Sequence, residues 1–323
     1  MLFGITTFAQ QDPQFSQYQD YSSFVNPSFV INDYQVNVDA QHRQQWVGFD
    51  GRPISTLVNI SVDLNRGENG FTVKVPETGS WLKRNFLKTI SKSGFGVTVL
   101  SDKLGAQYSG AVRFNYAYCI TIGEHRIIPG IYTGLLYNTL DGSKLNPIQT
   151  GDQNIISSNQ GGLAFDMGIG LSYRFKGLVV GFSANHLTRP TLEYADGSTV
   201  SQVTVARHYY GLIRYDFKIG RVFRLKPLTF FKTDGASAQV DNWLWFGFDN
   251  LNKYLNRVNI GVGYRIDDAV MVAGEVVFKW FRVGYSYDIT TSGLNGYSNG
   301  SHEVTLRMHL FKSGEAKAAN VAE

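Results

Sequence analysis

The feature that most constrains the fold is a two-residue hydrophobic period that persists through long segments. Between Leu163 and Phe175 every second side chain is apolar, and the residues between them are small or charged. Such alternation puts all apolar side chains on one face of a β-strand. The pattern recurs along the chain and predicts fourteen strands: 35–48, 54–65, 95–102, 107–121, 125–138, 162–175, 178–187, 202–218, 222–232, 237–248, 256–266, 269–276, 278–289 and 302–311.

These strands predict an all-β, antiparallel barrel of the outer-membrane type. Many span 11–15 residues, which is long for a globular protein. Tight turns at 122–124, 176–177, 219–221 and around Val277 alternate with long loops at 139–161, 188–201 and 290–301, as in outer-membrane barrels. The strands of a soluble sandwich would also alternate between apolar and polar residues, but the glycine-rich polar face favours a crowded barrel lumen. A sheet in lipid must also close.

The polar face supplies the predicted lumen. Acidic and basic residues occur there in equal numbers, which favours ion pairs between neighbouring strands. A ring of charges of a single sign would instead have indicated ion selectivity. The predicted lumen charges are Asp39, Asp63, Asp166, Asp216, Asp241 and Asp288 with Arg43, Arg113, Arg174, Arg214, Arg265 and Arg282.

The remaining segments complete the domain prediction. Residues 1–10 are apolar and end in a small-x-small pattern, so we interpret them as the remnant of a signal peptide, with a buried first strand as the alternative. Residues 11–33 form an N-terminal plug or periplasmic segment, 34–312 the barrel, and 313–323 a polar C-terminal tail. The insertion 66–94 contains "WLKRNFLKTISKS", whose spacing suggests a short interfacial helix.

Four stretches resemble the PorP/SprF family of type IX secretion outer-membrane proteins of Bacteroidetes. They are "QDPQFSQY" with the following "NPSF", "HRQQWVGFDGRPIS", "GFGVTVLSDKLG" and "YSYDITTSGLNGYSNGSHEVTL". The resemblance implies a barrel in the outer membrane that receives, helps export or anchors a large surface protein, such as a gliding adhesin with a C-terminal sorting domain. It also implies contact with the periplasmic secretion ring. The long insertion, Ser28 in "NPSFV" and the polar tail depart from the family pattern.

Motifs for catalysis, metal or cofactor binding are weak. "GYSNG" at 296–300 has the spacing of a nucleophile elbow but lies before a strand instead of a helix, so a hydrolase is the weakest alternative. The histidines do not form a metal-ligand set by spacing, and the glycine motifs precede no helix. Cys119 is the only cysteine, which excludes an intramolecular disulfide. The basic residues are dispersed, which argues against nucleic acid as a partner.

We therefore predict a non-enzymatic secretion component without cofactors, embedded in outer-membrane lipid. The alternative is a diffusion channel for a small hydrophobic or oligosaccharide solute. Aromatic and polar residues outside the strands are the candidates for partner contact, because aromatic side chains often anchor interfaces. They are Asp12, Phe15, Gln17, Tyr18, Trp46, Tyr194, Leu294 and Tyr297.

Overall fold

The computed structural model describes residues 12–17, 23–32, 34–64, 92–144, 160–196, 199–252 and 254–312. The predicted signal-peptide remnant, the helix of the insertion and the C-terminal tail lie outside these residues. No helix in the described part of the chain is long and apolar enough to cross a membrane.

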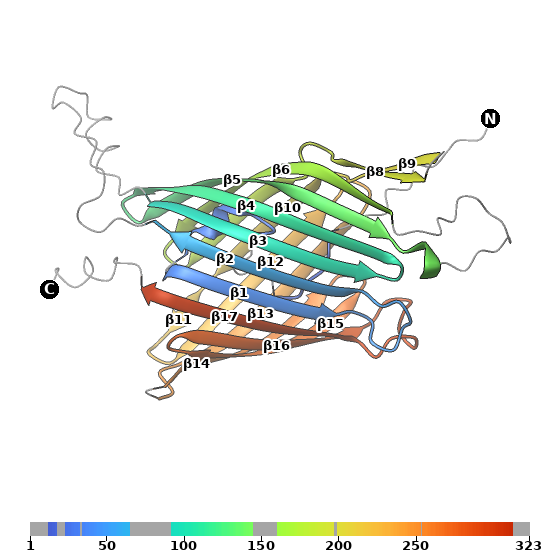
Figure 1. The fold of residues 1–323 in the computed structure, drawn as a ribbon. Coiled ribbons are helices and arrows are strands. Elements are labelled where there is room, and N and C mark those ends of the chain that lie inside the picture. The colour runs from blue at the N-terminus through green and yellow to red at the C-terminus, as the bar shows by residue number, and fades with distance from the viewer. Residues whose placement is uncertain are drawn as a thin grey trace, which may run out of the picture.

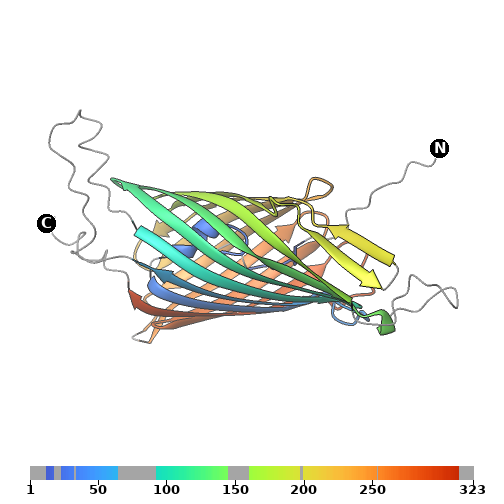
Figure 2. The same ribbon diagram turned by 45° about the horizontal axis from the view of Figure 1, so that its top comes forward.

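The chain forms a closed antiparallel barrel (Figures 1 and 2). The ring closes where the first strand pairs with the last, Tyr34 opposite Lys312 and Gln44 opposite His302. The barrel strands are β1 (Tyr34–Gln44), β2 (Ile54–Asp63), β3 (Lys92–Leu104), β4 (Gln107–Ile122), β5 (His125–Leu140), β6 (Gln160–Phe175), β7 (Leu178–Asn185), β10 (His208–Tyr215), β11 (Phe217–Ile219), β12 (Phe223–Thr233), β13 (Ala238–Asp249), β14 (Leu255–Arg265), β15 (Ala269–Phe278), β16 (Phe281–Thr290) and β17 (Ser301–Lys312). β10 and β11 both pair with β12 and together occupy one strand position in the ring. The fifteen strands of the described residues therefore fill fourteen positions, which confirms the predicted fold.

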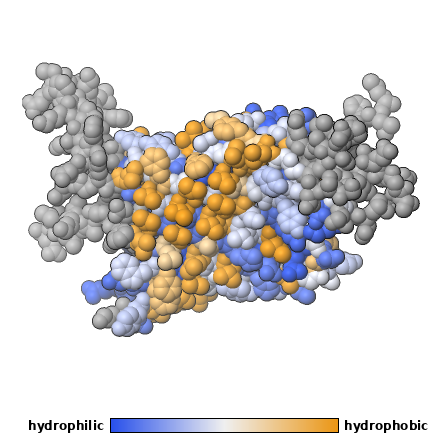
Figure 3. All heavy atoms as spheres, in the orientation of Figure 1, coloured by the Kyte–Doolittle hydropathy of each residue, from blue (hydrophilic) through white to orange (hydrophobic). Residues whose placement is uncertain are grey.

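The two-residue period explains which face of each strand points outward. In β6, Leu163 and Ile169 are 65% and 50% exposed, whereas Asp166 and Ser172 of the same strand are fully buried. Outward apolar side chains form a broad band over the strands (Figure 3). The polar side chains therefore face the lumen, and the apolar band faces lipid.

The two ends of the barrel differ in their connections. We call the end with the short turns 123–124, 176–177, 220–222 and 279–280 the turn end. The opposite end, which carries the connections between β5 and β6, between β7 and β10 and between β16 and β17, together with the short turns 105–106 and 266–268, is the loop end.

One expectation about the strands was wrong. The sequence predicted a loop at 188–201 followed by a single strand at 202–218, but β8 (Thr191–Asp196) and β9 (Thr199–Thr204) form a separate hairpin. The barrel strand begins only at His208. Leu192 and Val205 are buried in the same cluster as Phe24 and Leu100, so these side chains pack against the plug segment and the inner wall at the loop end.

Residues 12–17 and 23–32, which we call the plug segment, lie inside the ring of strands. The backbone N–H of Asp12 contacts His208 at the loop end, and the carbonyl of Ile31 accepts a hydrogen bond from Arg174 near the turn end. The segment thus runs from the loop end to the turn end, where β1 begins. Its short 3-10 helix, η2 (Pro27–Val30), is visible within the barrel (Figure 2).

Candidate functional site

Glycines of the inner wall form a bed for the plug segment. A Cβ atom at Gly130 of β5 would lie 2.5 Å from the backbone nitrogen of Ser28, and one at Gly181 of β7 would lie 2.8 Å from Phe29. Gly94 and Gly96 of β3 approach Ile31 and Val30 in the same way, each at 2.6 Å. Larger residues would force these neighbours to move, so the glycine-rich polar face of the strands provides room for the plug segment.

Polar side chains fix the position of the plug segment on this bed. The Asn26 amide donates to the carbonyls of Phe182 (2.9 Å) and Leu171 (3.3 Å), and its oxygen accepts from the N–H of Ser28. From the wall, Ser183 donates to the carbonyl of Val25 at 2.7 Å. Asn26 thereby caps η2 and joins it to β6 and β7, which explains an asparagine directly before Pro27.

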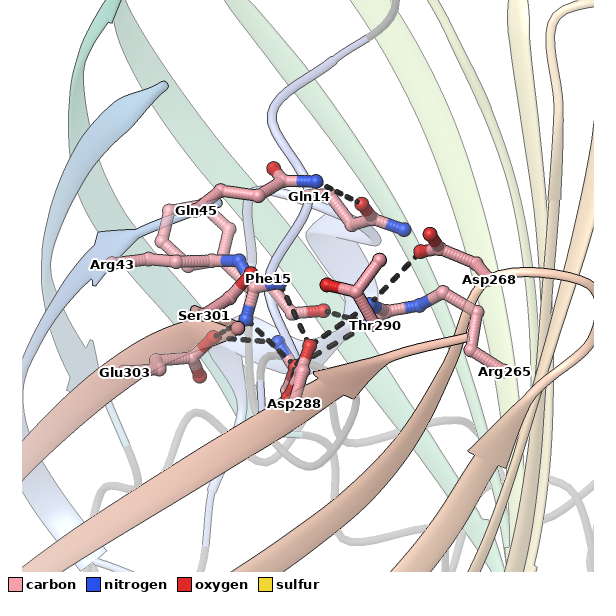
Figure 4. A network of polar contacts seen from close by, with 12 residues as sticks. Gln14, Phe15, Arg43, Gln45, Arg265, Asp268, Asp288, Thr290, Ser301 and Glu303 are labelled. Carbon is pink, nitrogen blue, oxygen red and sulfur yellow. Dashed lines mark hydrogen bonds and ion pairs between the residues drawn. The ribbon is translucent and has the colours of Figure 1, made fainter. Parts of the chain in front are cut away.

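A buried charge network joins the start of the chain to its end near the loop end (Figure 4). Asp288 contacts both Arg43 (2.8 Å) and Arg265 (2.9 Å). The hydroxyl of Ser16 donates to Asp288 at 2.8 Å, and its backbone N–H donates to Glu303 at 2.6 Å. We call this set, completed by Asp241 against Arg265, the seam network.

The seam network satisfies charges that would otherwise be costly in the lumen. Its two arginines and three carboxylates are almost fully buried, and breaking such a set by removing one partner is strongly unfavourable. Because Arg43 also donates to the hydroxyl of Ser16 at 2.9 Å, the plug segment is part of the charge balance. The network therefore holds both the barrel closure and the plug segment.

A second polar cluster holds the first described residue of the plug segment. His186 Nε2 lies 3.1 Å from Asp12, and His186 Nδ1 lies 3.0 Å from Asp166. Tyr210 donates to the other oxygen of Asp12 at 2.5 Å. Burial raises the pKa of Asp12, but His186, His208 and Arg113 more than offset it and hold the pKa well below its usual range.

A cavity of about 560 Å³ lies between the plug segment and the wall near the loop end. Asp12, Phe24, Trp46 and Lys232 are among its lining residues, together with Leu192 of the β8–β9 hairpin. Its lining mixes apolar side chains with charges of both signs.

The predicted lumen residues separate into two groups. Asp39, Arg43, Arg113, Asp166, Arg265 and Asp288 are buried, as are Asp63 and Asp241. The others are half-buried: Asp216 pairs with Arg224 at 2.9 Å, Arg282 with Glu275 at 3.1 Å, and Arg174 bonds the plug segment, while Arg214 lies at the wall near the turn end. Opposite charges thus pair within the wall as well as in the seam network.

The predicted partner-binding residues lie in three different places. Asp12, Phe15 and Gln17 are inside the barrel, where Phe15 is buried and Gln17 bonds Glu303 through its N–H at 2.9 Å. These three side chains therefore contact the wall and do not form a periplasmic surface. Trp46 is half-buried at the cavity. Tyr18 and the side chain of Tyr194 lie outside the described residues.

Leu294 and Tyr297 belong to the connection after β16. Leu294 is half-buried, whereas Tyr297 is 74% exposed. This connection is tied to the one after β1 by two backbone hydrogen bonds, Val47 N–H to Gly300 (2.8 Å) and Asn299 N–H to Val47 (2.7 Å). Tyr297 therefore sits on a supported loop at the loop end.

Sequence reasoning missed several buried polar residues of the site. Glu275 and Glu303 occupy inward positions of the alternation in β15 and β17, so the same period could have identified them. His186 and His208 flank strand ends, where the period gives no information about direction. Only the pairing of β7 with β10 brings these two histidines together.

Comparisons with known proteins agree with the fold. The family model described as type IX secretion system membrane protein PorP/SprF matches residues 7–308. No curated protein sequence matches the chain significantly.

Solved structures resemble the barrel at low identity. The toluene transporter TbuX of Ralstonia pickettii has a TM-score of 0.48 and 7% identity, over 89% of this chain and 92% of that one. TodX of P. putida has a TM-score of 0.45 and 10% identity, over 91% and 95%. Omp33 of Acinetobacter baumannii has a TM-score of 0.42 and 10% identity, over 86% and 98%. At such values the likeness says nothing about what this chain binds.

Proposed function

The chain belongs to the PorP/SprF family of type IX secretion system outer-membrane proteins, and from this premise we propose that it is a plugged docking scaffold. It receives, helps export or anchors a cognate secreted surface protein, such as a gliding adhesin with a C-terminal sorting domain. Family and fold together point to a non-enzymatic role.

The occupied lumen is the observation that carries this proposal. Phe15, Phe24 and Phe29 of the plug segment are buried inside the barrel. The seam network joins the same segment to the first and last strands of the ring, β1 and β17. A barrel filled by its own chain is suited to present surfaces to other proteins, because its lumen is already taken.

The proposed docking surfaces follow from the orientation usual for outer-membrane barrels, in which long loops face outward. The exported protein contacts the loop end, where residues 139–161, 188–201 and 290–301 lie. The periplasmic secretion ring contacts the turn end. A direct contact of the ring with residues 11–18 requires that the plug segment leave the lumen, since Asp12 to Gln17 are enclosed there.

A loop truncation tests this proposal. Replacing residues 291–300 by a two-residue turn should leave the barrel in the outer membrane but remove the cognate protein from the cell surface. The matched control shortens the 234–237 connection, also at the loop end, and should leave the surface proteins unchanged. Surface proteins are compared by protease shaving and mass spectrometry. If the truncated barrel inserts and the surface proteins remain, the docking surface is wrongly assigned.

The cavity favours a second candidate function, a diffusion channel. Its volume of about 560 Å³ falls in the range of small-molecule sites. Loss of a channel should slow uptake of a small hydrophobic or oligosaccharide solute and leave surface proteins intact. Loss of a docking scaffold should do the opposite, so measuring both in one deletion strain separates the two functions.

A further inference from the structure

Two buried histidines and one carboxylate converge where the plug segment meets the wall near the loop end. His186 directly follows β7 and His208 begins β10, and their rings lie 5.2 Å apart between centroids. Both side chains are buried, and His186 lines the cavity together with Asp12 of the plug segment. One ligand atom from each of the three lies within 4.8 Å of the others.

The imidazoles are oriented so that both Nε2 atoms face Asp12. The Nδ1 of His208 lies 3.0 Å from the carbonyl of Ala206, and a carbonyl only accepts, so that nitrogen carries the proton. Its Nε2 then carries a lone pair, which accepts from the N–H of Asp12 at 3.2 Å; a bound metal ion would take the place of this hydrogen bond. His186 directs Nδ1 to Asp166 at 3.0 Å and Nε2 to Asp12 at 3.1 Å. Histidines that bind metals are held in this way, with the other nitrogen against a carboxylate or carbonyl.

We propose that Asp12, His186 and His208 form a binding site for a divalent transition metal of the Zn²⁺ class, which ties the plug segment to the wall. Two imidazole nitrogens and one carboxylate are a usual ligand set for zinc, with a water in the fourth position. The adjoining cavity offers room for that water. Ca²⁺ and Mg²⁺ fit poorly, because they prefer oxygen ligands.

The charges around the site permit a cation despite the nearby arginine. Arg113 lies 3.4 Å from Nε2 of His186 and opposes a metal ion. However, its guanidinium donates to the carbonyl of Phe24 at 2.7 Å and lies over the rings of Phe24 and Tyr132. Lys232, which lines the same cavity, is a second nearby cation. Asp12 and Asp166 supply two negative charges against those of Arg113 and Lys232, so with both histidines neutral the surroundings carry no excess of positive charge.

The metal site is independent of the docking role. It concerns how the plug segment is held in the lumen, and this does not depend on which proteins bind the barrel. A ligand that binds only the seated segment stabilises that state by mass action. Metal bound to Asp12, His186 and His208 links the plug segment to the wall at the end of β7 and the start of β10. The segment should therefore leave the lumen less often when the metal is present.

Metal titration of the full-length barrel in detergent, without a histidine tag, tests the site. After chelator treatment, Co²⁺ should bind at about one ion per chain with visible absorption bands, and Zn²⁺ should displace it. His186→Gln and His208→Gln should each abolish this binding, and Asp166→Asn should weaken it by about 10–100-fold as a positioning residue. The matched controls are His125→Gln and His302→Gln, at one exposed and one half-buried histidine outside the site, and both should bind as the unchanged protein does.

A second measurement keeps the test valid if a variant folds poorly. With a cysteine in place of Val25 and Cys119→Ala, Zn²⁺ should slow thiol labelling of the plug segment in the otherwise unchanged barrel. The same addition should have no effect in the His208→Gln barrel. Binding of Co²⁺ that the histidine substitutions leave unchanged, or labelling that Zn²⁺ does not slow, would overturn the proposal. Because neither readout involves surface proteins, its failure is distinguishable from failure of the docking role.

Discussion

Substituting Gly130 by alanine is the sharpest test of the glycine bed. The added Cβ would lie 2.5 Å from the backbone nitrogen of Ser28, 2.7 Å from the carbonyl carbon of Pro27 and 2.8 Å from Cα of Ser28. Ordinary contacts begin at 3.4 Å, so the plug backbone must move by about 0.9 Å. It cannot do so freely, because Asn26 holds the N–H of Ser28 and the carbonyl of Phe182 together.

The expected cost can be converted into a labelling rate. Overpacking of this kind costs about 1–3 kcal/mol, and each 1.4 kcal/mol is a factor of ten in an equilibrium constant. The population with the plug segment out of the lumen should therefore rise about 5–150-fold, if the barrel itself is unaffected. Thiol labelling of a cysteine at Val25, in the Cys119→Ala background, should accelerate by the same factor.

The matched control is Gly110→Ala, another strand glycine, whose Cβ would meet only the carbonyl of Leu100 at 3.5 Å. It should label at the rate of the unchanged protein. Equal rates for Gly130→Ala and Gly110→Ala would refute the argument that inner-wall glycines seat the plug segment. Heat-modifiable migration in electrophoresis checks that each barrel is folded.

Further predictions concern the wall and its orientation. Arginine at Ile169, which faces outward, should reduce the membrane-inserted fraction, because a charge near the bilayer centre costs about 2–4 kcal/mol; normal insertion would argue against a lipid-facing β6. Arg265→Met should lower barrel stability by about 3–5 kcal/mol, because it leaves buried carboxylates unpaired, and urea unfolding in detergent would show it. A single cysteine at Asn295 should label on intact cells, whereas one at Lys176 should label only after the outer membrane is opened. The reverse pattern would invert the orientation.

The alternation of side chains was enough to predict the barrel, because each strand follows one rule along its whole length. In β6, the inward Asp166 and the outward Ile169 were both assigned from the period alone, and the structure agrees. The same rule failed at residues 202–207, which it assigned to a barrel strand. Residues Thr199–Thr204 pair instead with β8 in a separate hairpin, and the barrel strand begins only at His208.

The position of the plug segment could not be predicted from local sequence. "NPSF" has no strand period, and its bed consists of glycines on β3, β5, β6 and β7, which are brought together only by the pairing of these strands in the sheet. The cluster of Asp12, His186 and His208 depends on the pairing of β7 with β10 and on the return of the plug segment into the lumen, since Asp12 is separated from His208 by 196 residues. Spacing along the chain therefore gave no sign of it.

The direction of the plug segment decides which contacts bear a pull on it from each end of the barrel. Asp12 lies near the loop end, and Asn32 lies near the turn end next to β1. A force on Asn32 passes almost directly into β1, which starts at Tyr34. A force on Asp12 must first act on the contacts between the plug segment and the inner wall. The pairing of β1 therefore bears a pull from the turn end, and the contacts of the plug segment bear a pull from the loop end.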